Sequence, residues 1–138
     1  MMVTNVRRIF YYHMKVVDQP GEAYKRLAQL KGLGVSLVAF AMFPEGPAHT
    51  RLTIFPDDAG VLSYQAKKAG MKLDGPHPAL LVQGSDQLGA LEEIHQKLYD
   101  AHVNVSASAG AADGKGGYGY ILYVKPDEYD RAVSALEL

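Results

Sequence analysis

The chain has 138 residues, of which 48% are hydrophobic and 21% are charged, and its formal net charge is −1. This length fits one domain or two very small ones, and the near-neutral charge excludes a field that would attract nucleic acid or an anionic membrane. The lack of cysteine excludes disulfides, thiolate catalysis and thiolate metal sites. Because no signal peptide or membrane-spanning apolar run is recognisable, a cytoplasmic protein is expected.

The first half of the chain predicts the order strand, helix, strand, strand, helix. Apolar and polar side chains alternate from Ile9 to Val17, which is typical of a strand with one face in the core. A helix is expected to start with Pro20 in its first turn and to run to about Lys31. Three further elements follow: a buried central strand at 35–43, a returning strand at 50–55, and a helix between Pro56 and Gly70.

The second half predicts the same order again. Residues 71–73 can form a short closing strand of the first half, and Asp74–Pro78 is expected to be the stiff joint between the halves. The elements expected after it are strand 79–83, helix 88–99, strands 103–109 and 118–124, and a helix opened by Pro126. This last helix places Tyr129, Ala132, Val133 and Leu136 on one face. No strand is predicted after it.

A sequence repeat supports this division. The segment Asp18–Ala41 recurs 68 positions later as Asp86–Ala109, with seven identical residues at equivalent positions. Average residue usage would give roughly one or two such matches. The chain is therefore expected to contain two copies of one unit, at residues 1–75 and 76–138. Each copy alone would bury too little surface to be stable, so the two are expected to pack together.

The order strand, helix, strand, strand, helix, strand is that of the ferredoxin-like fold. The predicted fold class is α+β, with two βαββαβ repeats, the second of which lacks its last strand. In this fold both helices cover one face of the sheet. The other face would carry Tyr11, His13, Lys15, Leu81 and Gln83. The missing strand leaves an open edge that favours pairing with another chain, so a homo-dimer or a higher oligomer is expected.

At the start of each repeat the sequence resembles the ACT domain. Asp18-Gln19-Pro20-Gly21 with Gly34-Val35 carries the pattern of an acidic residue, proline and glycine before a helix, then Gly-Val before a strand. Asp86-Gln87-Leu88-Gly89 with His102-Val103 carries a weaker version, with leucine for proline and histidine for glycine. The resemblance implies a regulatory protein that binds an amino acid or a related acid and no cofactor. The ligand-binding residues that it implies are Asp18, Gln19, Pro20, Gly21, Asp86, Gln87 and Gly89. An alternative hypothesis is a purely structural or partner-binding protein, such as the detached regulatory subunit of a biosynthetic enzyme.

Elementary chemistry is consistent with such a site. The first N–H groups of a helix lack internal partners and attract a carboxylate, and glycine allows close approach to the backbone. The competing interpretation of Asp18 and Asp86 is that they cap the helices that follow.

A second hypothesis is a small enzyme of the ferredoxin-like dimeric-barrel type, acting on an aromatic or lactone metabolite. The sheet face that carries Tyr11, His13 and Lys15 could hold such a substrate. The five histidines show no metal-ligand spacing, so no metal site is predicted. Gly114, Gly116 and Gly119 match G-x-G-x-x-G, but a strand follows them where a phosphate-binding helix should start, so a hairpin loop is expected. Tyr118 and Tyr120 are expected to pack on one strand face with their hydroxyls at the rim.

Overall fold

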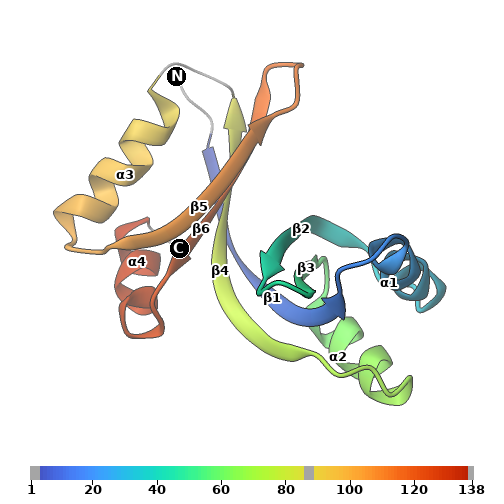
Figure 1. Cartoon of the computed structure of the whole chain (residues 1–138). Helices are drawn as coiled ribbons and strands as arrows, with labels where there is room; N and C mark the ends of the chain where they lie inside the picture. Colours follow the sequence, from blue (N-terminus) through green and yellow to red (C-terminus); the bar gives the residue numbers. More distant parts are fainter. Residues whose placement is uncertain (1–3, 86–88, 137–138) are drawn as a thin grey trace. The chain divides into compact units, whose positions relative to one another are not determined.

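A computed structural model describes residues 4–85 and 89–136 of the chain (Figure 1). The described residues form an α+β fold, as predicted. Its strands are β1 (Thr4–Val17), β2 (Leu37–Glu45), β3 (His49–Pro56), β4 (Asp74–Ser85), β5 (Val105–Ala112) and β6 (Gly117–Val124). Its helices are α1 (Glu22–Gly32), α2 (Ala59–Lys68), α3 (Ala90–Asp100) and α4 (Tyr129–Ala135), and the short 3₁₀-helix η1 (Pro126–Glu128) precedes α4.

The chain divides into two compact units. The first unit consists of Phe10–His77, and the second consists of the chain from Pro78 onward together with β1 up to Ile9. Strands β1 and β4 therefore contribute residues to both units. The strand order is β2-β3-β1-β4 in the first unit and β1-β4-β6-β5 in the second. Among the described residues, no strand follows α4. The N-terminal end of β1 occupies the place of such a strand beside β4.

In the first unit, the alternation predicted for β1 is observed. Tyr12, Met14 and Val16 face a core that also contains Leu52 and Ile54 of β3. The helices cover this face with Leu30 of α1 and with Leu62 and Ala66 of α2. The intervening residues of β1 lie on the other face, where His13 stands opposite Thr53 in the antiparallel pairing with β3.

Glycines set the limits of α1. The helix begins after Gly21, whose φ of 88° is readily adopted only by glycine, so Pro20 precedes the helix instead of forming its first turn. The other end is a left-handed turn at Gly34, φ 75°. There the N–H of Val35 donates to the carbonyl of Leu30 at 3.0 Å.

Two expectations about the first unit are wrong. The apolar run after α1 forms β2, which is an edge strand and not a buried central one; Phe43 is 61% exposed. A continuous apolar run does not by itself indicate which strand neighbours it will have. Residues 71–73 form no strand, and the expected joint from Asp74 to Pro78 is instead the beginning of β4.

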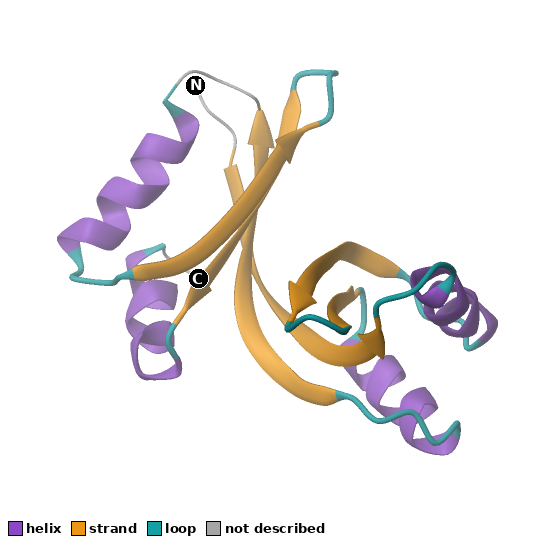
Figure 2. Cartoon of the chain, in the orientation of Figure 1, coloured by secondary structure: helices purple, strands orange, loops and turns teal. Residues whose placement is uncertain are grey.

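In the second unit, α3 and α4 lie on the same side of β5 and β6 (Figure 1). Ile94 and Leu98 of α3 and Val133 of α4 pack on Leu80 of β4 and Leu122 of β6. Val6 of β1 contacts the same core. The predicted hairpin loop joins β5 to β6, and Figure 2 shows it as a short teal segment between these strands. None of the described helices has the length and apolarity that crossing a bilayer requires.

Candidate ligand-binding site

The predicted ligand-binding residues lie where two helices begin. Asp18, Gln19, Pro20 and Gly21 are exposed and lead into α1. Gly89 is the N-cap residue of α3, and its φ of 87° matches the 88° of Gly21 at the N-cap of α1. The two repeats therefore enter their first helices in the same way. Asp86 and Gln87 lie outside the described residues.

The capping interpretation is wrong for Asp18. No side chain caps the N-terminus of α1, and the N-cap position belongs to Gly21. The backbone N–H of Asp18 instead donates to the carbonyl of Ala48 at 2.9 Å. By contrast, the carboxylate of Asp58 does cap α2, because it accepts from the N–H of Val61 at 3.1 Å. The amides at the start of α1 are consequently not occupied by a capping side chain.

A hollow of about 660 Å³ lies at the start of α3, within the second unit. It is lined by the first turn of the helix, residues 89–92, and by the β5–β6 hairpin, residues 110–112 and 118–120. The first N–H groups of a helix have no intrahelical acceptor and lie at the positive end of its dipole. The hollow can therefore accept an anionic group at the helix end and apolar groups against the hairpin.

Two tyrosines of β6 form the polar part of the hairpin wall. The hydroxyl of Tyr120 lies 2.6 Å from His95 Nε2 of α3. The hydroxyl of Tyr118 is buried and has no hydrogen-bond partner among the described residues. Gly110 on β5 makes room for the Tyr120 ring, because a Cβ at this position would lie 2.7 Å from Tyr120 Cδ1. The sequence indicated that Tyr118 and Tyr120 share a face, but not that this face meets the start of α3.

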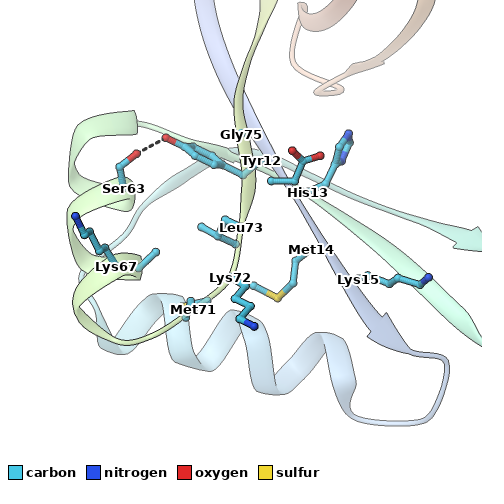
Figure 3. A pocket seen from close by; sticks show the side chains of 12 residues that line it. Tyr12, His13, Met14, Lys15, Ser63, Lys67, Met71, Lys72, Leu73 and Gly75 are labelled. Atoms are coloured by element: carbon cyan, nitrogen blue, oxygen red, sulfur yellow. Dashed lines mark hydrogen bonds between the residues drawn. The ribbon is translucent and has the colours of Figure 1, made fainter.

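A second hollow, of about 740 Å³, lies in the first unit (Figure 3). It is lined by β1 from Tyr12 to Lys15, by residues of α2 and by the segment 71–75. On one side the Tyr12 hydroxyl donates to the carbonyl of Ala59 at 3.2 Å and lies 2.5 Å from Ser63 Oγ. Neither of these hollows is lined by residues 18–21. No sequence motif indicates this hollow, because its lining residues come from three separate segments.

Aromatic side chains cluster on the face of the first unit that α1 and α2 leave uncovered. The ring centroid of Tyr11 is 5.1 Å from that of His13, 5.2 Å from that of His77 and 5.5 Å from that of Phe55. His77 Nε2 lies 3.3 Å from Asp74 Oδ2. Burial raises the pKa of Tyr11, and Asp74 adds to this. The enzyme hypothesis relied on Tyr11 and His13, and both lie in this cluster.

Burial lowers the pKa of His13, and the positive charges of Arg51 and His77 lower it further, against the smaller influence of Asp74 and Glu45. The folded protein therefore binds this proton less tightly than the unfolded chain. The stabilising contribution of neutral His13 is complete above the unfolded pKa of about 6.5 and is lost as the pH falls below it.

We expect His13→Gln to reduce the loss of melting temperature between about pH 8 and pH 5. The measurement is thermal unfolding followed by circular dichroism at both pH values. Equal losses in the variant and the parent would contradict the prediction.

Among the described residues, no group of three or more histidine, aspartate or glutamate side chains is arranged to hold a metal ion.

The comparisons with known proteins concern the fold. No protein-family model and no curated protein matches the chain. A protein of Bacteroides thetaiotaomicron matches 97% of this chain with 88% of its own, at a TM-score of 0.75 and 13% identity. The ligand-free regulatory subunit of aspartate kinase from Thermus thermophilus is also similar. The match covers 99% of this chain and 94% of that subunit, with a TM-score of 0.61 and 13% sequence identity.

The allosteric aspartate kinase of Clostridium acetobutylicum matches 97% of this chain with 33% of its own, at a TM-score of 0.53 and 17% identity. At such identities the likeness shows the fold alone. The ACT-domain resemblance drawn from the sequence is thus confirmed as a likeness of fold: the chain has the fold found in the regulatory subunits of aspartate kinase.

Proposed function

We propose that the protein is a regulatory protein that binds an amino acid or a related carboxylic acid, and that it acts on a biosynthetic enzyme. The observation that carries the proposal is the hollow at the start of α3. Its lining includes Gly89, one of the residues for which the ACT-domain resemblance implies ligand binding. The structural likeness to a regulatory subunit and to an allosteric kinase supports a regulatory role.

The hollow offers chemistry for each part of an amino acid. The ligand carboxylate would accept from the N–H groups in the first turn of α3, where Gly89 carries no side chain to obstruct it. The carboxylate of Glu92, which lines the hollow, would accept from the ammonium group. The rings of Tyr118 and Tyr120 and the small residues of β5 would contact the ligand side chain. After the costs of association, binding near or weaker than about micromolar is expected.

Asp18, Gln19, Pro20 and Gly21 would form the equivalent site in the first unit, and Asp86 and Gln87 would complete the site beside Gly89. Since Asp18 does not cap α1, Asp18→Ala tests the site in the first unit without removing a helix cap.

A homo-oligomer remains part of the proposal. It is supported by β5, whose residues 106–112 are all exposed along the edge of its sheet. Light scattering that shows only monomer at micromolar concentration would contradict it.

The experiment is a thermal-shift screen of the full chain against the twenty amino acids and related acids. A ligand at 100 times its dissociation constant adds about 2.7 kcal/mol of stability, enough to raise the melting temperature by several degrees. Ala112 pairs with Tyr118 on β5, so its side chain points to the same face of the sheet as Tyr118. We expect Ala112→Trp to fill the hollow and to abolish the shift, while the exposed position leaves the unliganded melting temperature nearly unchanged.

The matched control is Ala109→Trp. Ala109 is exposed on the same strand, pairs with Ile121 and points to the opposite face. This variant should respond to the ligand as the parent does. A screen in which no acid raises the melting temperature, or an Ala112→Trp variant that still responds fully, would refute the proposed function.

A further inference from the structure

In the first unit, one end of β1 has a free edge. The N–H of Asp18 faces β3, because it donates to Ala48 just before that strand. Backbone N–H and C=O groups of successive residues in a strand point alternately to its two sides. Those of Lys15 and Val17 therefore point away from β3, toward the side on which β4 runs. Gly75 of β4 confirms this alternation, because a Cβ there would lie 2.8 Å from the carbonyl oxygen of Tyr11.

Strand β4 does not reach this end of β1. It begins at Asp74, beside Tyr11 and Tyr12, and continues toward the early part of β1 that belongs to the second unit. Residues 71–73, which precede it, are not in a strand. Among the described residues, no strand therefore pairs with the outward backbone groups of Lys15 and Val17. A free strand edge of this kind is a template for another extended chain.

A groove follows this free edge. The hollow of about 740 Å³ and a smaller one of about 250 Å³ share Met14, Lys15, Met71 and Lys72 in their linings, so they adjoin. Met14 and Met71 supply an adaptable apolar surface. The groove lies entirely in the first unit and is separate from the hollow at the start of α3.

The charges of the groove are unbalanced. Its lining residues include Lys15, Arg26, Lys67 and Lys72, against Asp74 as the single carboxylate among those described. None of these four cations forms an ion pair with a described carboxylate. Arg26 Nε is buried and has no hydrogen-bond partner among the described residues. The groove therefore favours an anionic occupant.

The arrangement of the cations indicates what kind of anion. Figure 3 shows Lys67 and Lys72 set apart along the hollow instead of converging on one point, and Lys15 pointing away from both. A compact anion would need converging donors. An extended chain places alternate side chains about 6.6 Å apart and can offer several carboxylates along its length.

We propose that this groove binds an extended acidic segment of a partner protein, which adds as a strand to the free edge of β1. Backbone groups of the segment pair with the N–H and C=O of Lys15 and with the N–H of Val17, whose carbonyl already accepts from the N–H of Gln19 at 3.0 Å. Because the side chains of an added strand alternate between its two faces, its carboxylates lie together on the helix-covered face, toward Arg26, Lys67 and Lys72, while Lys15 lies on the opposite face. This surface is independent of amino-acid binding in the second unit, so either proposal can fail without the other.

The probe is a fluorescein-labelled peptide, Val-Glu-Val-Glu-Val-Glu-Val, titrated with the full chain and followed by fluorescence anisotropy. We expect saturable binding that weakens steeply with added salt. The double variant Lys67→Glu/Lys72→Glu should weaken it at least tenfold. The control Lys68→Glu/Lys97→Glu makes the same change of charge at two exposed lysines outside the groove, and it should bind nearly as the parent does.

Two further arms test the strand pairing itself. A peptide that is N-methylated at alternate residues keeps its charges but loses the backbone N–H groups that would donate hydrogen bonds to the edge of β1. It should bind the unaltered protein at least tenfold more weakly than the unmodified peptide does. Val17→Pro removes an N–H that faces the free edge, a position at which strands tolerate proline. The Val17→Pro variant should bind the unmodified peptide more weakly than the parent does, and its circular dichroism spectrum should show that the fold is retained.

The proposal is overturned by the absence of saturable binding up to millimolar protein, or by equal affinity for the methylated peptide. It is also overturned if free citrate with the same total carboxylate displaces the peptide as well as unlabelled peptide does, since that result indicates a site for compact anions. The methylated peptide decides the question even where the double glutamate variant fails to fold.

Discussion

Gly75→Ala is expected to lower the free energy of unfolding by about 2–5 kcal/mol, through overpacking and backbone strain together. The added Cβ would lie 2.8 Å from the carbonyl oxygen of Tyr11 and 2.7 Å from Tyr12 Cδ2. The carbonyl belongs to the backbone of β1 and cannot move aside without disturbing the pairing of β1 with β4. Gly75 also has a φ of 151°, which side-chain-bearing residues rarely adopt. Urea unfolding followed by circular dichroism measures the loss.

Gly32→Ala is the matched control for this substitution. Gly32 is the last residue of α1, and a Cβ there would meet nothing within 4 Å. Alanine in a helix is favoured over glycine by up to about 1 kcal/mol, so this variant should equal or exceed the parent in stability. If Gly75→Ala unfolded at the same urea concentration as the parent, the described contact of β4 with β1 would be wrong.

Leu62→Ala is expected to cost about 2–5 kcal/mol of stability, the range observed for leucine cavities in well-packed cores. Leu62 is fully buried on α2, where it packs in the core with Tyr12, Met14 and Ile54. The adjoining helices and strands fix these neighbours, so the cavity can close only in part. The same urea measurement reports the effect.

The neighbouring residue supplies the comparison. Val61 lies one position earlier on α2 and is 40% exposed. Val61→Ala removes two methyl groups from a partly solvated face and should change stability by no more than about 0.5 kcal/mol. Similar losses for the two variants would show that α2 does not bury the face described.

Local signals in the sequence predicted most of the elements. The alternation in β1 assigned Tyr12 and Met14 to the core and His13 to the opposite face, because side chains of successive strand residues point to opposite faces. The spacing of Ala132, Val133 and Leu136 likewise predicted the buried face of α4. Such signals depend on residues a few positions apart, whose geometry the backbone itself determines.

The turn before the first helix of each repeat was predictable for the same reason. Gly21 and Gly89 were singled out by the repeat, and both adopt a left-handed backbone directly before a helix. What Asp18 does there was not predictable, because an aspartate before a helix is compatible both with capping and with a free carboxylate. The turn geometry of residues 18–21 excludes the cap.

The amino-acid sequence by itself determined the α+β class and the repeated order of elements. Only the tertiary structure decided that β2 is an edge strand, that β1 completes the sheet of the second unit, and that Tyr118 meets the start of α3. It alone placed Lys15, Lys67 and Lys72 around one groove. The physical reason is that periodicity and backbone preference act between near neighbours in the chain. Strand pairing and the linings of hollows join segments tens of residues apart, and many pairings are compatible with the same local pattern.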